Sequence, residues 1–403
     1  MKGTFRSLAN PGYRLWFAGA AVSNVGTWMQ RIAQDWLVLT QLTPNSATAV
    51  GVIMALQFGP SLLLLPFTGV AADRVDRRRL LLATQAVQSV LALLLGLLTI
   101  SGTVVLWHVY VLAFLLGCAT AFDGPARQTF LADLVGEAQL ANAVALNAAS
   151  FNSARMIGPA VAGLLIATAG IGGVFLINAA TYMPVLGILA RLERAVLPRP
   201  PAPELPGNLG AALRYLAARG DMLALLFMLF LVATFGLNFP IFIATMTVAV
   251  FHEDVGSYGF LTSMMAIGSV AGALLTAHRQ SPRIPQIIRS AAIFGLCCLL
   301  AALAPGYAAF AALLQATGVA AQVFTTSTNS LLQLEADPAV RGRVVSIVLA
   351  VFLGTTPIGS PAVGWVADTW GPRWALGVAA ASGFGAALVG LLFCRKQKAE
   401  GDA

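Results

Sequence analysis

The stretch that decides the fold is Gly69–Arg79, with the sequence GVAADRVDRRR, which lies between two apolar runs that are each long enough to cross a bilayer. Four arginines and two aspartates fall within residues 73–79, and such a concentration of charge is too costly to place in hydrocarbon. The stretch is therefore expected to form a short aqueous loop between two membrane helices. Its excess of arginine places the loop on the cytoplasmic side by the positive-inside rule.

The composition of the whole chain is typical of an integral membrane protein. Of 403 residues, 58% are hydrophobic and 10% are charged, whereas a soluble domain has about 45–50% apolar and about 25% charged residues. A net charge of +8 could suggest nucleic-acid binding. The basic residues gather in loops on one predicted side, however, so we expect no nucleic-acid partner.

Apolar runs predict twelve transmembrane helices, which would put both termini on the same side of the membrane. The predicted spans are 15–41, 47–70, 79–101, 105–124, 140–169, 172–191, 222–249, 257–277, 288–304, 307–330, 343–368 and 373–394. With cytoplasmic termini, all Lys and Arg residues fall in cytoplasmic loops or tails except Arg373 outside and Arg31 and Arg155 within spans. This asymmetry predicts a multi-pass protein of the plasma (inner) membrane.

One long polar segment, residues 192–221, divides the chain near its middle. Its prolines exclude a continuous helix and favour an extended connector, and apolar residues at helical spacing within 209–216 predict a short helix on the membrane surface. We therefore predict three parts. They are an N-terminal six-helix bundle at 1–191, a cytoplasmic linker with an amphipathic helix at 192–221 and a C-terminal six-helix bundle at 222–403.

The charged loop resembles the signature of the major facilitator superfamily, which reads roughly G-x-L-A-D-R-x-G-R-R/K between its second and third helices. The matching residues are Gly69, Asp73, Arg74, Arg77 and Arg78. In this chain Ala71 stands in place of Leu, and Asp76 stands in place of Gly. The resemblance implies an all-α fold of twelve transmembrane helices in two pseudo-symmetric six-helix bundles.

An internal repeat also favours two related halves. Gly158, Gly163, Thr168 and Gly170 recur 201 residues later as Gly359, Gly364, Thr369 and Gly371. Chance alignment is the alternative, because glycine is common in membrane helices. Since the offset is half the chain, a duplication of six helices is the better interpretation, with a solute path between the halves.

The first predicted span is unusually polar. Asn24, Trp28, Arg31 and Asp35 step by four, three and four residues, so they share one helical face. That face is expected to look into the bundle, because charge facing lipid is costly. One interpretation is a structural ion pair between Arg31 and Asp35, one turn apart. The other gives Asp35 a proton-coupling role, with the carboxylate alternating between protonation and pairing with Arg31 or Arg155.

The fifth predicted span carries Arg155 near its middle, where an arginine needs an anionic partner. By depth, Asp35 is the nearest candidate, and the resemblance implies that the first and fifth helices are neighbours. The segment Gly158–Gly163, with Gly158, Pro159 and Gly163, is similar to the G-P-x-x-G-G end of a motif in proton-driven exporters. Ordinary close packing of small residues is the alternative.

The fourth predicted span departs from such exporters, because it lacks the arginine that they often carry midway. At its end the sequence Asp123-Gly124-Pro125-Ala126-Arg127 resembles the enterobactin-exporter and macrolide-efflux branch of the superfamily. The resemblance implies that Arg74, Arg77 or Arg78 pairs with Asp123, and that Asp73 faces the start of the eleventh helix, as a cytoplasmic latch. Alternatively, the arginines set the topology and bind anionic lipid headgroups.

Polar side chains in other spans are candidates for a substrate cavity. The full set of cavity candidates is Asn24, Trp28, Gln34, Asn238, Gln322 and Thr326. Aromatic, amide and hydroxyl groups suit an amphipathic or lipophilic solute, while hydrogen bonding between helices is the alternative.

Signals for an enzyme or a cofactor are absent from the sequence. There is no phosphate-binding Gly-Lys-Ser/Thr loop, the three histidines are scattered, and the four cysteines lie in or beside apolar runs, so we expect no catalytic residue, no metal and no disulfide framework. The proton gradient would be the only energy source.

We therefore predict a monomeric transporter, surrounded by membrane lipids, that exports small amphipathic molecules such as antibiotics or siderophores by proton antiport with alternating access. An importer or facilitator without proton antiport is the nearest alternative. A non-transporting membrane sensor or assembly protein is an alternative of another class, which the short tail after Arg395 argues against.

Overall fold

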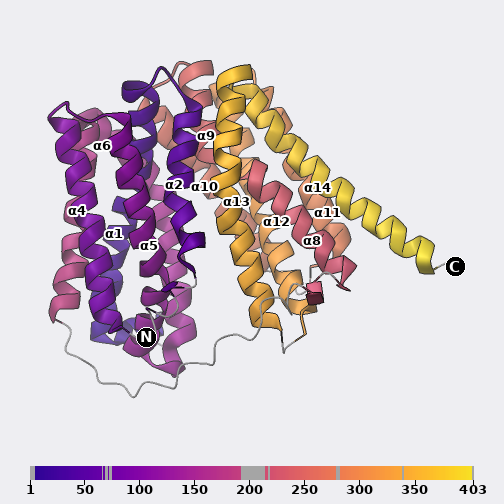
Figure 1. The fold of residues 1–403 in the computed structure, drawn as a ribbon, viewed down its shortest axis with the longest axis horizontal. Coiled ribbons are helices and arrows are strands. Elements are labelled where there is room, and N and C mark those ends of the chain that lie inside the picture. Colours follow the sequence, from indigo (N-terminus) through magenta and orange to yellow (C-terminus); the bar gives the residue numbers. More distant parts are fainter. Residues whose placement is uncertain are drawn as a thin grey trace. The chain divides into compact units, whose positions relative to one another are not determined.

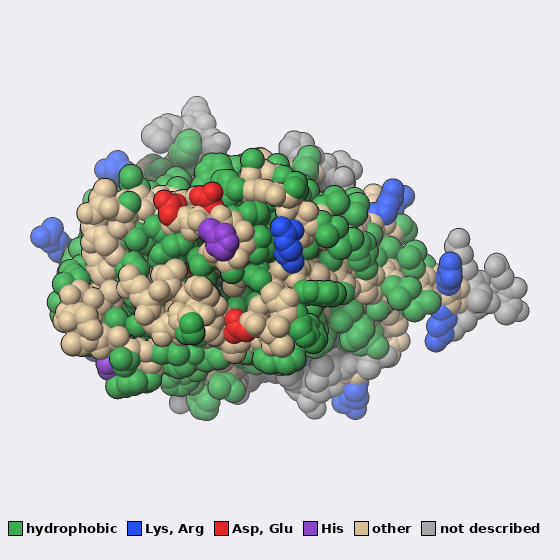
Figure 2. Space-filling view, turned by 90° about the horizontal axis from the view of Figure 1, so that it is seen from above, with side chains coloured by type: hydrophobic (Ala, Val, Ile, Leu, Met, Phe, Trp, Pro, Cys, Tyr) green, Lys and Arg blue, Asp and Glu red, His purple; other side chains and the backbone are tan. Residues whose placement is uncertain are grey.

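The regular structure of this protein is helical throughout the part of the chain that its computed structural model describes, and Figure 1 shows its course. The described residues are 5–65, 67–68, 71, 75–191, 214–216, 218–277, 282–337 and 340–401. Nine helices in these ranges are long and apolar enough to cross a membrane. Many large hydrophobic side chains on these helices are exposed, among them Leu97 (51%), Trp107 (60%) and Leu164 (67%). This is the surface expected of a protein whose solvent is lipid. Figure 2 looks onto one end of the helices, where a few charged side chains lie among hydrophobic and polar ones.

The helices follow the predicted spans in order. In the first half they are η1 (Arg6–Ala9), α1 (Pro11–Leu37), the π-helical turn η2 (Val38–Leu42), α2 (Ala47–Leu63), α4 (Arg77–Ile100), α5 (Leu106–Val135) and α6 (Glu137–Arg191). In the second half they are α8 (Gly220–Leu231), the π-helical turn η3 (Val232–Gly236), α9 (Phe239–Thr245), the π-helical turn η4 (Met246–Val250), α10 (Val255–Ala277), α11 (Ile284–Ala302), α12 (Tyr307–Glu335), α13 (Arg341–Trp370) and α14 (Pro372–Gly401).

Two predicted boundaries differ from the structure in an informative way. The predicted fourth span ends at 124, but α5 continues to Val135, because the charged side chains beyond 124 have partners and the segment can stay helical. The predicted fifth and sixth spans both lie within α6. The helix is kinked at Gly170, whose φ of 72° is in the left-handed region that glycine adopts most easily. The kink falls between the two predicted spans.

The chain divides into two compact units, and each takes one segment from the other half of the sequence. Unit 1 comprises Met1–Pro44, Leu56–Ala202 and Asp254–Ser263, and unit 2 comprises Asn45–Ala55, Pro203–Glu253 and Met264–Ala403. The start of α10 therefore packs in unit 1, and the start of α2 packs in unit 2. The boundary between Ala202 and Pro203 falls in the predicted linker, of which residues 192–213 and 217 lie outside the described residues.

The repeated glycines lie at equivalent helix contacts. A Cβ added to Gly158 would come within 2.6 Å of Trp28 in α1, and one added to Gly359 would come within 1.7 Å of the Thr234 carbonyl in η3. The second pair of repeated glycines also lies at close helix contacts. Gly163 packs against α10 at Gly256, and Gly364 packs against α2 at Ala47. The first and seventh spans, and the second and eighth, thus take corresponding places, as expected for a duplicated six-helix unit.

Arg373, the one basic residue predicted outside, has a structural role. Its guanidinium donates hydrogen bonds to the carbonyls of Ala302 (2.6 Å) and Ala304 (3.0 Å), where α11 ends. A cation at a helix C-terminus satisfies free carbonyls and complements the helix dipole. This contact explains an exception to the charge asymmetry without altering the predicted topology.

Candidate functional site

The polar face of α1 forms the candidate site, together with residues from α6 and the start of α10. Asn10 caps α1, since its side chain accepts a hydrogen bond from the Tyr13 N–H (3.1 Å), and the helix then runs unbroken to Leu37. Trp28, Arg31 and Asp35 lie on one side of it, as the spacing predicts.

Asp35 is a buried carboxylate that has a hydroxyl partner in place of a cation. Its side chain accepts a hydrogen bond from the Tyr258 hydroxyl in α10 (3.2 Å), and the residue is 7% exposed. The Tyr258 ring also stacks on Trp36, with ring centroids 6.0 Å apart. No arginine or lysine of the described chain lies within 4.0 Å of an Asp35 oxygen. The structure thus differs from both predicted ion pairs, Arg31–Asp35 and Arg155–Asp35.

Arg31 and Arg155 both lie against the Trp28 ring instead. The guanidinium carbon of Arg31 lies 4.7 Å from the centre of the Trp28 ring and 5.4 Å from that of Phe58. The guanidinium carbon of Arg155 lies 5.7 Å from the same Trp28 ring, and Phe151 packs edge-on against it. Aromatic faces attract cations, so the rings provide part of what the missing carboxylate contacts would have supplied.

Helix α1 carries two buried side-chain donors that lack a hydrogen-bond partner in the described part of the chain. The Trp28 Nε1 and the Gln34 Nε2 are buried without a hydrogen-bond partner among the described residues, and Gln34 is only 2% exposed. Buried donors are normally satisfied. The unpaired Trp28 N–H and the guanidiniums of Arg31 and Arg155 beside it are therefore suited to a molecule that carries acceptor oxygens on an apolar body.

The exporter-like motif lies where α6 packs closely on its neighbours. Besides the contact of Gly158 with Trp28, a Cβ at Gly163 would come within 2.9 Å of the Gly256 Cα, and one at Gly259 within 2.3 Å of the Pro159 carbonyl oxygen. The motif residues Gly158, Pro159 and Gly163 thus bring α6 against α1 and α10. They position Arg155 and Tyr258 rather than presenting polar groups of their own.

The described part of the predicted cytoplasmic latch comprises Asp123, Arg77 and Arg78. Asp123 accepts hydrogen bonds from Thr84 (2.9 Å), Gln85 (2.7 Å) and Arg127 (2.9 Å), the last of which is one turn further along α5. Of the three arginines predicted as its partner, Arg77 and Arg78 do not pair with Asp123, so these two alternatives are wrong. Gly69, Asp73 and Arg74 lie outside the described residues.

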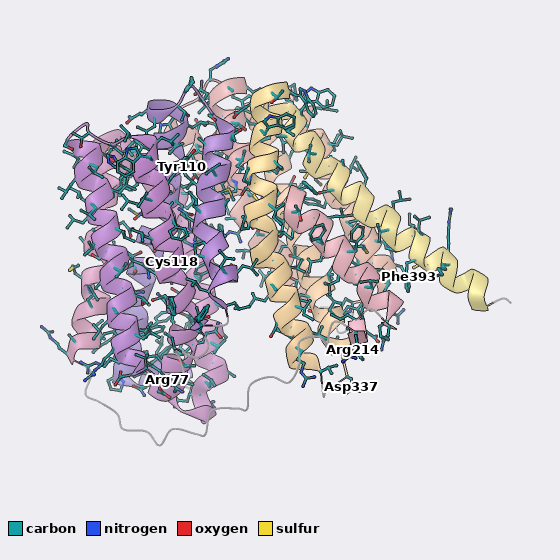
Figure 3. All side chains as sticks on the ribbon, in the orientation of Figure 1. Arg77, Tyr110, Cys118, Arg214, Asp337 and Phe393 are labelled. Atoms are coloured by element: carbon teal, nitrogen blue, oxygen red, sulfur yellow. The ribbon has the colours of Figure 1, made fainter. Side chains whose placement is uncertain are left out.

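The arginines at the start of α4 have other partners in unit 1. Arg77 pairs with Asp133 at 2.5 Å, and Arg78 donates to the carbonyls of Leu189 and Ala190 at the end of α6. Arg77 lies at the opposite end of the unit from Tyr110 (Figure 3). These contacts tie α4 to α5 and α6, which is a structural use of the basic loop.

The predicted cavity residues of the second half bond within their own segments. The Asn238 amide donates to the Thr234 carbonyl (2.7 Å), and the Gln322 amide donates to the Thr326 hydroxyl (2.8 Å). The three cavity candidates Asn238, Gln322 and Thr326 belong to unit 2, whereas Asn24, Trp28 and Gln34 belong to unit 1.

Two contact residues, Tyr258 and Asp368, were missed by the sequence analysis. Asp368 in α13 accepts hydrogen bonds at the start of α2, from the Ser46 hydroxyl (3.0 Å) and the backbone N–H groups of Ala47 (2.6 Å) and Thr48 (2.9 Å). A carboxylate near the C-terminal end of its own helix is unfavourable there, and this signal could have pointed to a partner elsewhere. Tyr258 lies in an ordinary apolar run and carries no comparable signal.

The helices of the described chain that are long and apolar enough to cross a membrane, together with a family model that matches nearly the whole chain, define the class of this protein, which is a multi-pass transporter of the major facilitator type. The chain belongs to the transmembrane secretion effector family of that superfamily, whose family model matches residues 2–403. The members of this group that it matches are transporters and not enzymes.

Two curated relatives match over nearly the full length. The staphyloferrin A transporter of Staphylococcus aureus is 25% identical over 361 residues, which cover 89% of this chain and 90% of that protein. The enterobactin exporter EntS of Shigella flexneri is 26% identical over 389 residues, which cover 95% and 91%.

Solved structures agree on the fold. A bacterial homologue of the iron transporter ferroportin, in an inward-facing state, superposes with a TM-score of 0.75 at 14% identity and covers 95% of this chain and 98% of its own. A bacterial homologue of the human lysosomal transporter Spinster gives a TM-score of 0.73 at 14% identity, with 98% coverage of both chains. At this identity the likeness shows the fold alone.

Proposed function

We propose that this transporter exports small amphipathic molecules of the siderophore or drug type across the inner membrane, as a monomer with cytoplasmic termini, by proton antiport with alternating access. Two similar full-length proteins carry the names staphyloferrin A transporter and enterobactin exporter. They support a siderophore as the first substrate class to test. The unpaired Trp28 N–H and the two guanidiniums beside its ring support a solute rich in acceptor oxygens.

The observation that carries the proton-coupled part is the hydrogen bond from Tyr258 to Asp35. A carboxylate away from water and with no arginine or lysine within 4.0 Å among the described residues is costly to keep charged, and a proton removes that cost. A hydrogen bond to a charged acceptor is roughly twice as strong as one between neutral groups. Charged Asp35 thus holds Tyr258 and the start of α10 firmly, and protonated Asp35 holds them weakly.

Helix α10 belongs partly to each compact unit, which would connect the protonation of Asp35 to a conformational change. Its first residues, to Ser263, pack in unit 1 and the remainder packs in unit 2. The Ser263 hydroxyl donates to the Met156 carbonyl of α6 (2.8 Å), so the start of α10 is fastened to α6 as well as to Asp35. Protonation of Asp35 loosens one of these attachments, which is how proton binding would bias one conformation of the transporter over another.

The test is uptake into energised inside-out vesicles that contain the purified chain. Such vesicles have an acidic lumen, and a proton-driven exporter accumulates a siderophore or a macrolide inside them as protons leave. We expect accumulation to stop when the gradient is collapsed. Equilibration without accumulation, at a rate that ignores the gradient, would instead establish a facilitator.

A second prediction tests alternating access through the contact of α2 with α13. In a chain without its native cysteines, Ser46→Cys and Asp368→Cys replace two groups that lie 3.0 Å apart. If this contact opens in each cycle, joining the two thiols with a short bis-maleimide will block transport. The same double variant without cross-linker, and each single variant with it, are expected to stay active. Unchanged transport by fully cross-linked protein would show that the contact does not open.

A further inference from the structure

We propose that a groove between α11 and α12 in unit 2 binds an anionic phospholipid of the cytoplasmic leaflet, with its headgroup on Arg283 and Arg289. This site is separate from the candidate transport site, and it does not depend on the proposed direction of transport or on its coupling to protons.

The groove has a volume of about 1030 Å³, which is at the upper end of the range for ligand pockets in proteins. From α11, a face with a repeat of four residues lines it, comprising Arg289, Ile293 and Cys297. From α12 comes a strip of small and β-branched residues, comprising Ala316, Val319, Ala320 and Val323. The small side chains on α12 leave room for the groove. Beyond its arginine end the groove is lined by apolar side chains, as an acyl chain requires.

Polar groups line the groove at one end only. They are Arg283, Gln286, Arg289 and Ser290, all near the start of α11. The two arginines are six residues apart, which corresponds to about 9 Å along a helix. A cationic end and an apolar remainder match an amphipathic molecule with a negatively charged head.

The charge of these arginines is not neutralised by the described part of the protein. The Arg289 Nε donates to the Pro285 carbonyl of its own helix (3.3 Å). Neither guanidinium lies within 4.0 Å of a described carboxylate oxygen. The start of α4, the corresponding third helix of the first half, is different, because Arg77 there pairs with Asp133. The basic groups of α4 serve the fold, whereas those of α11 remain available to a ligand.

The surroundings of the groove indicate that its occupant comes from the membrane. Ile293 is 53% exposed and Leu275, on the α10 side of the groove, is 54% exposed. In a membrane-spanning segment such exposed apolar side chains face lipid. The predicted topology places the arginine end at the cytoplasmic leaflet, where anionic lipids are concentrated and basic pockets between helices bind their headgroups.

Native mass spectrometry of the intact chain can test this site with defined lipids. Purified protein in a neutral detergent is mixed with equal amounts of phosphatidylglycerol and phosphatidylethanolamine, and the bound lipid is counted. Wild-type protein is expected to retain phosphatidylglycerol preferentially. Arg283→Gln with Arg289→Gln should lower that retention by about fivefold for each arginine removed. The matched control, Arg395→Gln with Lys396→Gln at the exposed end of α14, removes the same charge and should keep the preference.

A third variant, Ala316→Phe, tests the apolar part of the groove without altering charge. Its aromatic ring occupies space along α12, and we expect it to lower retention of phosphatidylglycerol while the arginines stay in place. Equal losses in the groove and control pairs would overturn the proposal, since they would reflect net charge alone. Unchanged retention in Ala316→Phe would also overturn it. So would a groove pair that keeps its lipid but loses solute transport, because that result would assign the groove to the solute.

Discussion

Asp35→Asn is expected to abolish gradient-driven transport while leaving the folded protein in the membrane. The substitution keeps the shape of the side chain and removes the group that can exchange a proton. In enzymes a positioned proton-transfer group contributes about 10²- to 10⁴-fold, so we expect accumulation in energised vesicles to fall by at least about 100-fold. An asparagine oxygen can still accept the hydrogen bond from Tyr258, so the packing of α1 against α10 should persist.

The measurement separates loss of coupling from loss of structure. Purified Asp35→Asn should elute as a single species with a thermal midpoint close to that of wild type, and it should still exchange solute between compartments of equal pH. Glu335→Gln is the matched control, because Glu335 is an exposed carboxylate beside Arg219 and its loss should leave accumulation unchanged. Full accumulation by Asp35→Asn would remove Asp35 from the coupling mechanism. Loss of both exchange and accumulation in a folded variant would assign Asp35 to solute movement itself.

The polar face of α1 illustrates what a sequence can and cannot predict about such a site. Helical spacing was enough to place Trp28, Arg31 and Asp35 on one face, because residues three and four apart are neighbours on any α-helix. Helical spacing does not identify the residues that these side chains contact on other helices. Tyr258 is 223 positions from Asp35 along the chain, and only the packing of α10 on α1 brings the two together.

Charge alone was a poor guide to pairing. The sequence offered Arg31 and Arg155 as partners for Asp35, since opposite charges attract strongly where water is scarce. In the structure both arginines lie on the Trp28 ring. The sequence shows which charged side chains the membrane helices must hold, but it does not show that a guanidinium will lie over an aromatic ring and form no ion pair with the carboxylate.

The fold was more predictable than the site because its signal is repeated along the whole chain. Each apolar run must bury its backbone hydrogen bonds inside a helix, so the order of helices follows from hydropathy. Helix ends are set by local contacts instead. The extension of α5 to Val135 depends on the Asp123–Arg127 pair and on the hydroxyl and amide of Thr84 and Gln85, which lie on another helix.

Gly359→Ala is expected to destabilise the protein although alanine is the better helix former. The added Cβ would come within 1.7 Å of the carbonyl oxygen of Thr234 and 2.6 Å of its carbon. These are backbone atoms of η3, and the same carbonyl accepts the hydrogen bond from Asn238 (2.7 Å), so the segment cannot move aside freely. Overpacking of this kind costs about 1–3 kcal/mol or more, which outweighs the gain of about 1 kcal/mol in helix propensity.

Gly377→Ala in α14 is the matched control, since a Cβ there meets nothing within 4 Å. It carries the same gain in propensity without the clash, so its thermal midpoint should equal or exceed that of wild type. The midpoint of Gly359→Ala should fall below that of Gly377→Ala by several degrees, at about 2–4 °C per kcal/mol for a domain of 150–250 residues. Thermal unfolding of both purified variants in one detergent gives the comparison. Equal midpoints would mean that α13 and η3 are not in close contact, and that the repeated glycines do not mark equivalent helix crossings.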